Sequence, residues 1–178
     1  MKKKIVITGG LGYIGTELCK LYSGLSWHHK IIVIDNRFIS ERVNQLRNWN
    51  MEFIHGDILD KDLMKKNCSD ADVVHHLAGV TEVPRTKSEV SKGQDEKIKE
   101  VAEKGTQNIL DVIKDKCKII FPSTHVVYEG ISEVKTNIKE NETTKPVLSY
   151  STSKATNEDQ LKKSGKNYII LRLGSVYG

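Results

Sequence analysis

The segment Thr8-Gly9-Gly10-Leu11-Gly12-Tyr13-Ile14-Gly15 joins a short apolar run, Lys4 to Thr8, to an amphipathic stretch from Gly12 to Ser23. Four of the chain's 13 glycines lie within it. Glycine permits a sharp turn after a strand, close approach of a pyrophosphate to the backbone and tight packing of the next helix. The N–H groups and positive dipole end of that helix then face the phosphates. The segment therefore predicts a dinucleotide-binding turn, with a tight turn that binds nothing as the alternative.

An acidic residue stands at the distance that such a turn requires. Asp35 closes the second apolar run, 20 residues after Gly15, where its carboxylate would accept hydrogen bonds from the adenosine ribose. An acid there repels the extra phosphate of NADP, so the sequence favours NAD. Arg37 is within reach of a ribose phosphate, but we interpret it as a solvated surface arginine.

Short runs rich in β-branched residues alternate with amphipathic stretches, which predicts an α/β fold with a doubly wound parallel sheet, the Rossmann fold. The pattern gives one domain over residues 1–178, with helices on both faces of six strands. The expected strands are Lys4–Thr8, Lys30–Ile34, Met51–His55, Val73–Leu77, Lys118–Pro122 and Tyr168–Leu173. The expected helices are Gly12–Ser23, Ser40–Asn48, Lys61–Asn67, Ser88–Lys114 and Tyr150–Ser164. The long irregular stretch Glu129–Leu148 is expected to have a function.

Composition excludes several classes of protein. The 178 residues are 38% hydrophobic and 29% charged, with a net charge of +5, which fits one globular domain rather than a disordered chain. Acids lie among the bases throughout, so we expect no nucleic-acid partner. The apolar stretch after the first lysines is only Ile5–Ile7, so we expect neither a signal peptide nor a membrane anchor. Cys19, Cys68 and Cys117 lack CxxC spacing, which favours buried, reduced thiols in the cytoplasm and no metal site.

Other strand ends carry further candidates. Asp57 would hold the adenine amino group or stabilise a turn, and the spacing leaves both roles open. The small residues of Leu77-Ala78-Gly79 would let backbone approach a cofactor. His75 and His76 are adjacent on a strand and point to opposite faces, so we interpret them as core histidines rather than metal ligands.

Tyr150 and Lys154 lie four residues apart at the start of a predicted helix, which puts both side chains on one face. The pair follows the strand that ends near Ser123 and Thr124, and ligands of open α/β sheets bind beyond the carboxyl ends of the strands. Thr124 and Tyr150 are therefore expected to converge near a nicotinamide held by the glycine-rich turn.

These motifs together resemble the extended short-chain dehydrogenase/reductase superfamily, and within it the NAD-dependent epimerase/dehydratase family of nucleotide sugars. The resemblance rests on TGGLGYIG, Asp35, the GDI of residues 56–58, HLAG, PSTHVVY, YSTSK and LRLGSVYG, in order from Lys4 to Gly178. It implies that Tyr150 is the general acid/base on a sugar hydroxyl, that Lys154 binds the nicotinamide ribose and lowers the tyrosine pKa, and that Thr124 hydrogen-bonds the same sugar oxygen.

The roles fit the chemistry of these side chains. A free tyrosine titrates near 10, while a cation about 4 Å away contributes roughly 4 kcal/mol at an effective dielectric near 20. Lys154 and the oxidised nicotinamide are thus expected to lower the Tyr150 pKa, against the opposing effect of desolvation. The expected catalytic residues are Thr124, Tyr150 and Lys154, and the expected cofactor-binding residues are Gly9, Gly12, Tyr13, Ile14, Gly15, Asp35, Asn36, Arg37, Asp57, Ile58, Leu77, Ala78, Gly79, Tyr150 and Lys154.

The sequence departs from the family pattern at several positions. Dehydratases and decarboxylases of the group usually carry an acid in the two positions after the threonine, here His125 and Val126, which favours epimerisation or simple oxidoreduction. Glu129 replaces an expected glycine, with Gly130 next, so the following loop is expected to shift. Ala102 and Ser175 stand where asparagines are common, which weakens inferences about the substrate.

The resemblance also implies a smaller carboxy-terminal substrate region, absent from this sequence, and we therefore favour a fragment of a longer protein over a natural minimal cofactor-binding domain. The first functional hypothesis is an NAD-dependent epimerase of a nucleotide sugar, with a UDP-hexose favoured and a ketoreductase as the alternative. The second is a non-catalytic NAD-binding regulatory module. The family further implies a homodimer through the helices Ser88–Lys114 and Tyr150–Ser164, whose apolar stripes would permit it.

Overall fold

Six parallel strands form one sheet in the order β3-β2-β1-β4-β5-β6. The computed structural model describes residues 2–80, 92–133 and 135–177, with side chains left out at 92–94. The strands are β1 (Lys4–Thr8), β2 (Lys30–Asp35), β3 (Glu52–His55), β4 (Val73–His76), β5 (Lys118–Thr124) and β6 (Asn167–Leu173). The α-helices are α1 (Tyr13–Tyr22), α2 (Ser40–Asn48), α3 (Lys61–Cys68), α4 (Lys92–Val112) and α5 (Ser149–Lys163), and η2 (His125–Tyr128) is a 3₁₀ helix.

This strand order is that of the doubly wound dinucleotide-binding sheet, so the predicted Rossmann fold is confirmed. The chain leaves β1 in one direction across the sheet, through β2 and β3, and later resumes on the other side of β1 with β4. The carboxyl ends of β1 and β4 therefore border the point where the winding reverses, which is where ligands bind in open α/β sheets.

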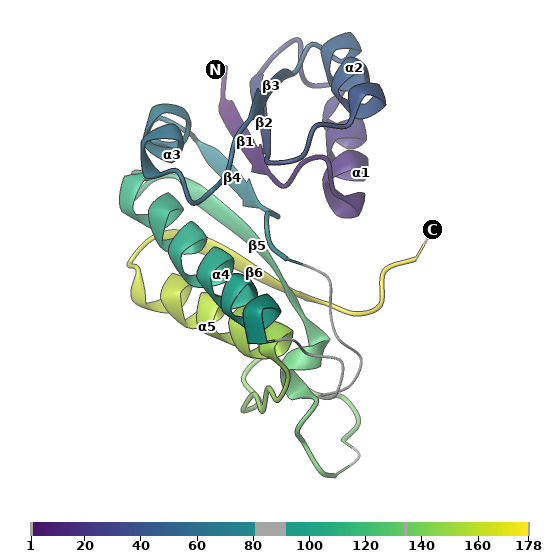
Figure 1. Cartoon of the computed structure of the whole chain (residues 1–178), viewed down its shortest axis with the longest axis vertical. Helices are drawn as coiled ribbons and strands as arrows, with labels where there is room; N and C mark the ends of the chain where they lie inside the picture. The colour runs from purple at the N-terminus through teal and green to yellow at the C-terminus, as the bar shows by residue number, and fades with distance from the viewer. Residues whose placement is uncertain (1, 81–91, 134, 178) are drawn as a thin grey trace.

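Two apolar cores lie on the two faces of the sheet, because successive strand side chains point to opposite sides. In β1, Ile5 and Ile7 join the core beneath α1 and α2, whereas Val6 joins the core beneath α3, α4 and α5. Figure 1 shows this arrangement, with α1 and α2 beside β1–β3 and α3, α4 and α5 on the opposite side of the sheet.

The predicted elements are all present, with small shifts at their ends. Strand β2 extends one residue further than predicted, to Asp35, and β5 two residues further, to Thr124, so both candidate site residues are the last residues of strands. Strand β4 ends at His76, one residue early. The predicted beginning of the fourth helix, residues 88–91, lies outside the described residues. Cys19, Cys68 and Cys117 are buried free thiols, as predicted.

Strand β6 is covered on one face only in the part of the chain that the structure describes. Arg172 and Ile170 point toward α5 and its core, whereas Ile169 and Leu171 are 38% and 44% exposed on the other face. The prediction of helices on both faces thus holds for the sheet near β1 and β2 but not for β6. None of the described helices has the length and apolar character needed to cross a membrane.

Candidate functional site

The glycine-rich turn occupies the carboxyl end of β1. Gly9 has a φ of +70°, and a Cβ there would lie 2.6 Å from the backbone nitrogen of Ala78. A Cβ on Gly15 would lie 2.5 Å from the carbonyl oxygen of Gly9. Only glycine allows this backbone to turn beside the end of β4 and helix α1 to start directly against it. The predicted turn is thus present, in the predicted context of strand and helix.

Among the described residues, no side chain forms a cap hydrogen bond at the amino-terminal end of α1. Its N-cap is Gly12, which contributes no capping side chain, and the first turn of α1 contains no acidic residue. Helix α3 differs, because the Asp60 carboxylate accepts a hydrogen bond from the Leu63 N–H and Asp62 lies in the first turn. A helix start without its own carboxylate is suited to bind an anion such as a pyrophosphate. Tyr13 and Ile14 are exposed beside it.

Asp35 braces the turn from the end of β2. Its carboxylate is buried and accepts hydrogen bonds from the backbone N–H of Leu11 (2.9 Å) and of Arg37 (3.0 Å). The Arg37 guanidinium also donates to it, from Nε at 3.2 Å. Arg37 is a surface arginine, as interpreted, with its side chain 56% exposed, and it also forms an ion pair with Asp35. Arg37 thus occupies part of the carboxylate that the adenosine ribose was expected to use.

Asp57 stabilises the turn after β3. One carboxylate oxygen accepts from the Leu59 N–H at 3.0 Å, and the other from the Asn36 side chain at 3.0 Å. Of its two proposed roles, the turn-stabilising one is therefore observed. Ile58 is buried, and a Cβ on Gly105 of α4 would lie 2.3 Å from its side chain. In this structure, Ile58 packs against α4.

The end of β4 carries a buried chain of polar groups. The His76 ring bonds the Thr8 hydroxyl at 2.9 Å and the Thr106 hydroxyl of α4 at 3.0 Å. Burial, with a smaller contribution from Lys154, lowers the pKa of His76 to about 3, so the ring is neutral. His75 bonds the Tyr22 hydroxyl on the other face. Both histidines are core residues, as predicted, and Leu77, Ala78 and Gly79 follow at the same edge as the glycine turn.

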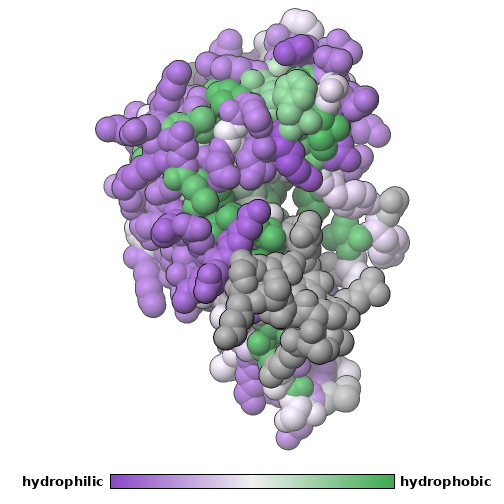
Figure 2. Space-filling view, in the orientation of Figure 1, coloured by the Kyte–Doolittle hydropathy of each residue, from purple (hydrophilic) through white to green (hydrophobic). Residues whose placement is uncertain are grey.

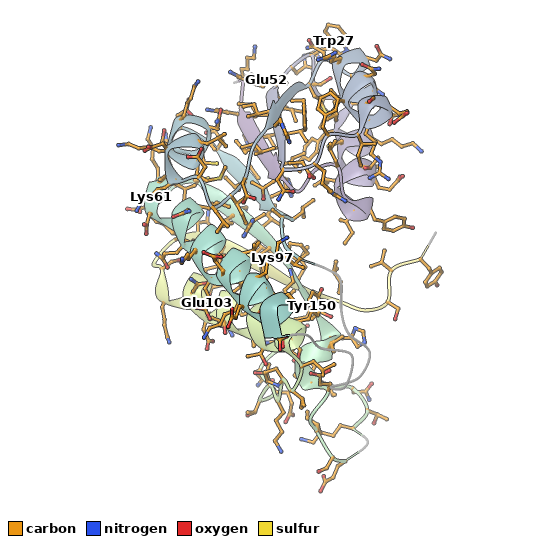
Figure 3. The ribbon with its side chains drawn as sticks, in the orientation of Figure 1. Trp27, Glu52, Lys61, Lys97, Glu103 and Tyr150 are labelled. Carbon is orange, nitrogen blue, oxygen red and sulfur yellow. The ribbon has the colours of Figure 1, made fainter. Side chains whose placement is uncertain are left out.

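Tyr150 and Lys154 lie in the first two turns of α5. Because α5 follows β5 and packs against it, its amino-terminal end lies at the carboxyl edge of the sheet, with the glycine turn. The Lys154 Nζ donates to the Pro122 carbonyl at 3.0 Å and lies 4.6 Å from the centre of the Phe121 ring and 5.8 Å from that of Tyr150. Figure 3 shows Tyr150 below the middle of the molecule, with Trp27 and Glu52 at the top.

Burial dominates the acid–base properties of this pair. It lowers the pKa of Lys154 to about 8 and raises the pKa of the Tyr150 phenol. The lowering of the Tyr150 pKa that was expected from Lys154 and the oxidised nicotinamide is therefore not seen in the protein by itself, because burial disfavours the charged phenolate.

Thr124 and Ser123 have different partners. The Thr124 hydroxyl accepts from the Val126 N–H at 3.2 Å and so caps η2, whereas the Ser123 hydroxyl donates to buried Glu158 at 2.6 Å. Glu158 also accepts from the Arg172 guanidinium, at 2.9 Å and 2.6 Å. The Ser123 hydroxyl is thus part of a buried network with Glu158 and Arg172.

Glu158 and Arg172 were missed in the sequence. Glu158 is 1% exposed, and although burial alone would raise its pKa, hydrogen bonds from Arg172 and Ser123 hold that pKa below its usual value. The available signal was spacing, because Tyr150, Lys154 and Glu158 recur every four residues and so share the face of α5 that meets β5.

This geometry defines a dinucleotide-binding domain of the Rossmann type with a tyrosine and a lysine on one helix at the carboxyl edge of the sheet. The chain belongs to the NAD dependent epimerase/dehydratase family, whose model matches residues 5–178. It is therefore related to the nucleotide-sugar epimerases and dehydratases of the extended short-chain dehydrogenase/reductase superfamily, and the cofactor of this family is NAD.

Similar proteins include both epimerases and dehydratases of nucleotide sugars. The chain is 32% identical to a putative UDP-glucose 4-epimerase of Methanocaldococcus jannaschii, over 98% of this chain and 56% of that protein. It is 30% identical to a dTDP-D-glucose 4,6-dehydratase of Dictyostelium discoideum, over 99% of this chain and 44% of that one. The UDP-glucuronic acid 4-epimerase of Bacillus cereus, solved with UDP-glucuronic acid and NAD, superposes with a TM-score of 0.78 at 27% identity, over 98% of this chain and 57% of that one. The chain spans about half the length of these relatives.

Proposed function

We propose that the protein is, or is part of, an NAD-dependent epimerase that acts on a nucleotide sugar by transient oxidation of a sugar hydroxyl to a ketone, with a UDP-hexose as the favoured substrate. The observation that carries this proposal is the buried Lys154, held by the Pro122 carbonyl beside Tyr150, at the edge of the sheet where the glycine turn begins α1. Similar proteins that act on UDP-sugars support it.

The residues present fit NAD. The open start of α1 and the backbone of Gly9, Gly12 and Gly15 would take the pyrophosphate, and Asp35 would take the ribose hydroxyls once Arg37 moves aside. Asp57 and Ile58 would border the adenine side, and the backbone of residues 77–79 would pass along the cofactor. When bound, NAD supplies a reversible hydride acceptor and a positive charge near the tyrosine.

The chain's own residues handle the proton. Tyr150, as phenolate, would take the proton of the sugar hydroxyl as the carbon loses hydride, and the Thr124 hydroxyl would donate a hydrogen bond to the same sugar oxygen. The Lys154 ammonium would stabilise the phenolate and bind the nicotinamide ribose. After the keto sugar rotates in the site, Tyr150 would return its proton while hydride is delivered to the other face of the carbon.

Two residues favour epimerisation over dehydration. Elimination of water needs a further acid and base near the sugar, but His125 and Val126 follow Thr124. His125 is exposed, and its Nδ1 bonds the Leu173 carbonyl at 3.2 Å. No carboxylate therefore stands at either position, in contrast to the pattern of dehydratases.

The test is conversion of UDP-glucose and related UDP-sugars to their epimers, with Tyr150→Phe as the diagnostic variant. The variant lacks only the hydroxyl, so we expect turnover to fall by about a hundredfold or more, the scale of general acid–base catalysis, while NAD binding measured by calorimetry stays within about twofold. Tyr168→Phe is the matched control, because Tyr168 lies on the edge strand β6. No conversion by the wild type, or full activity of Tyr150→Phe, would contradict the proposal.

A non-catalytic NAD-binding module is the second candidate. It is favoured by Ala102 and Ser175, which stand where the family commonly has asparagines. In the structure, the Ala102 carbonyl accepts from Asn157 of α5 at 2.9 Å, so the backbone at this position serves packing between helices. Binding of a UDP-sugar and reduction of NAD by it separate the candidates, since the module would bind NAD alone. Reduction without return of hydride would instead identify a ketoreductase.

We also propose that the protein is cytoplasmic and forms a homodimer through α4 and α5. These helices pack side by side, and Gln160 donates to the Glu103 carbonyl at 2.9 Å. The predicted apolar stripe of α5 is wrong, because four of its five buried residues are polar, namely Ser151, Ser153, Asn157 and Glu158, and only Leu161 is apolar. Figure 2 shows a mainly hydrophilic surface over α3 and α4. A dimer formed there would therefore be polar, and sedimentation equilibrium tests whether it forms.

A further inference from the structure

Glu129, which replaces the glycine common in the family, holds the start of the helix that carries Tyr150. Its Oε1 accepts hydrogen bonds from the backbone N–H groups of Val147 (2.8 Å) and Leu148 (2.7 Å) and from the Ser151 hydroxyl. These three partners bracket Tyr150 in the sequence. The backbone on both sides of the tyrosine is therefore held by one carboxylate.

Glu129 provides a capping carboxylate at the amino-terminal end of α5, which has no other cap among the described residues. The N-cap of α5 is Leu148, which has no capping side chain, and no acidic residue lies in the first turn. A carboxylate placed at the amino-terminal end of a helix satisfies unpaired N–H groups and interacts favourably with the helix dipole. Burial opposes its charge, but the hydrogen bonds from Ser151, Leu148 and Val147 outweigh burial and lower the pKa of Glu129. The group is thus a charged carboxylate at neutral pH.

Glu129 is itself anchored to the strand that ends in Thr124. Thr124 caps η2, and the N–H of Glu129 donates to the Val126 carbonyl at 3.0 Å. Two backbone bonds then join this segment to the one before α5, from Lys145 N–H to the Val127 carbonyl (2.8 Å) and from Gly130 N–H to the Lys145 carbonyl (2.9 Å). A short series of hydrogen bonds therefore connects Thr124, through the segment of residues 126–130, to the segment that precedes Tyr150.

Gly130 explains why the glycine of this motif has moved by one position. A Cβ on Gly130 would lie 2.6 Å from the Lys145 carbonyl oxygen. The close approach of the two segments thus requires glycine at 130, and position 129 is free to carry a side chain that reaches α5. The expected shift of the loop stays a prediction, while the structure shows that the side chain at position 129 contacts the start of the helix of Tyr150.

We propose that Glu129 is a positioning residue that fixes Tyr150 relative to Thr124, so that both hydroxyls reach the same substrate oxygen. This inference rests on the proposed function. A displacement of about 1 Å in a reacting group can cost roughly a hundredfold in rate, so the three bonds to Glu129 bear on turnover rather than on cofactor binding. The glycine turn and Asp35, which would hold the pyrophosphate and the adenosine ribose, lie at the ends of β1 and β2, far in the sequence from Glu129 and α5.

Two substitutions separate position from charge. Glu129→Ala removes the acceptor and the charge, and we expect kcat to fall about tenfold to a hundredfold with little change in NAD affinity. Glu129→Gln keeps an acceptor oxygen at the same place without the charge, and we expect it to retain most of the wild-type kcat. Glu142→Ala is the matched control, because it removes an acid of the same loop whose partner is Lys135, away from α5.

Amide hydrogen exchange of the wild type and these variants supplies a second readout that does not depend on a substrate. Exchange at Val147 and Leu148 should accelerate at least about tenfold in Glu129→Ala, stay near wild type in Glu129→Gln and remain unchanged in Glu142→Ala. If Glu129→Ala does not fold, Ser151→Ala, which removes one bond to the same oxygen, should show a smaller acceleration at Leu148 and a smaller loss of kcat.

The outcomes are distinct. Wild-type kcat and wild-type exchange in Glu129→Ala, or equal losses in Glu129→Ala and Glu129→Gln, would overturn the positioning role. An equal fall in NAD affinity and kcat would also overturn it, because it would show a general structural effect. If the wild type converts no sugar, the proposed epimerase function fails, whereas the exchange rates still decide whether Glu129 holds the start of α5.

Discussion

Lys154 shows how the environment of a single residue sets its chemistry. The side chain is buried, donates to the Pro122 carbonyl and lies over the Phe121 ring, and this burial lowers its pKa to about 8. The amine is therefore close to losing its proton near neutral pH, although the proposed role needs the ammonium form. A negatively charged Tyr150 phenolate would favour the ammonium form of Lys154. The two side chains are therefore expected to become charged together.

The buried amine makes stability depend on pH. The pKa of Lys154 is about 8 in the folded protein and 10.5 in the unfolded chain. Below pH 8 the folded state bears the full cost of burying the charge, on the order of 3 kcal/mol. Between pH 8 and 10.5 the unfolded chain binds a proton that the folded protein has lost, so the contribution of Lys154 to stability rises with pH. Relative to wild type, Lys154→Met should be more stable at pH 7, and the difference should shrink toward pH 10.

Urea denaturation across this pH range measures the difference. Lys163→Met is the control, since Lys163 is an exposed lysine of the same helix. It should leave the pH dependence of the unfolding free energy unchanged. A constant difference between Lys154→Met and wild type from pH 7 to 10 would contradict the lowered pKa. The same variant should lose turnover, which would show that stability is given up for function at this residue.

At the scale of elements, the buried Glu158 carboxylate joins α5 to strands β5 and β6. It accepts hydrogen bonds from Ser123 of β5 and from Arg172 of β6, and Arg172 continues to the Tyr128 hydroxyl of η2 and to the Glu140 carbonyl at 2.9 Å. The network therefore connects the helix of Tyr150 and Lys154 with the strand of Thr124 and with the loop before α5. We expect it to hold these elements in one arrangement.

Removal of Arg172, the cation paired with Glu158, should lower the unfolding free energy. Arg172→Met leaves Glu158 buried without its main cation, and we expect a loss of about 3 kcal/mol of unfolding free energy, as for other broken buried pairs. The double variant Glu158→Gln, Arg172→Met removes the unpaired charge and should recover part of the loss. Lys104→Met is the control, because it breaks only an exposed pair with Glu100 and should have little effect.

A double-mutant cycle by urea denaturation tests the coupling. The energies of the two single variants should not add to that of the double variant, since the residues contact each other. Additive effects would show that the pair contributes no coupling to the packing of α5 on β5 and β6.

At the scale of the whole molecule, the proposed cofactor would contact both halves of the sheet. The glycine turn and Asp35 belong to β1 and β2, whereas Tyr150 and Lys154 belong to α5, which covers β5. Figure 1 shows these two groups of elements in the upper and lower parts of the molecule. A ligand that binds across them stabilises only the folded state, so stability should rise with its concentration.

NAD should therefore stabilise the protein by about 2.7 kcal/mol at a hundredfold excess over its Kd. NADP at the same concentration should stabilise it less, because the buried Asp35 carboxylate repels the extra phosphate. In Asp35→Asn, the charge is lost and Arg37 is released from its ion pair, so the difference between the two cofactors should narrow. Thermal unfolding with each cofactor and calorimetric Kd values measure both effects. An equal response of the wild type to NAD and NADP would contradict the role of Asp35.

The amino-acid sequence by itself determined the order of the elements, the parallel sheet and the dinucleotide turn, because these depend on local patterns. β-branched runs, amphipathic spacing and clustered glycines act over short stretches, and Asp35, Thr124, Tyr150 and Lys154 were found by their places at strand ends and helix starts. Only the tertiary structure decided which side chains meet. The burial that raises the Tyr150 pKa and the bonds of Glu129 and Glu158 to distant segments depend on packing between elements. Such contacts and desolvation arise between residues far apart in the chain. Local sequence patterns therefore do not predict them.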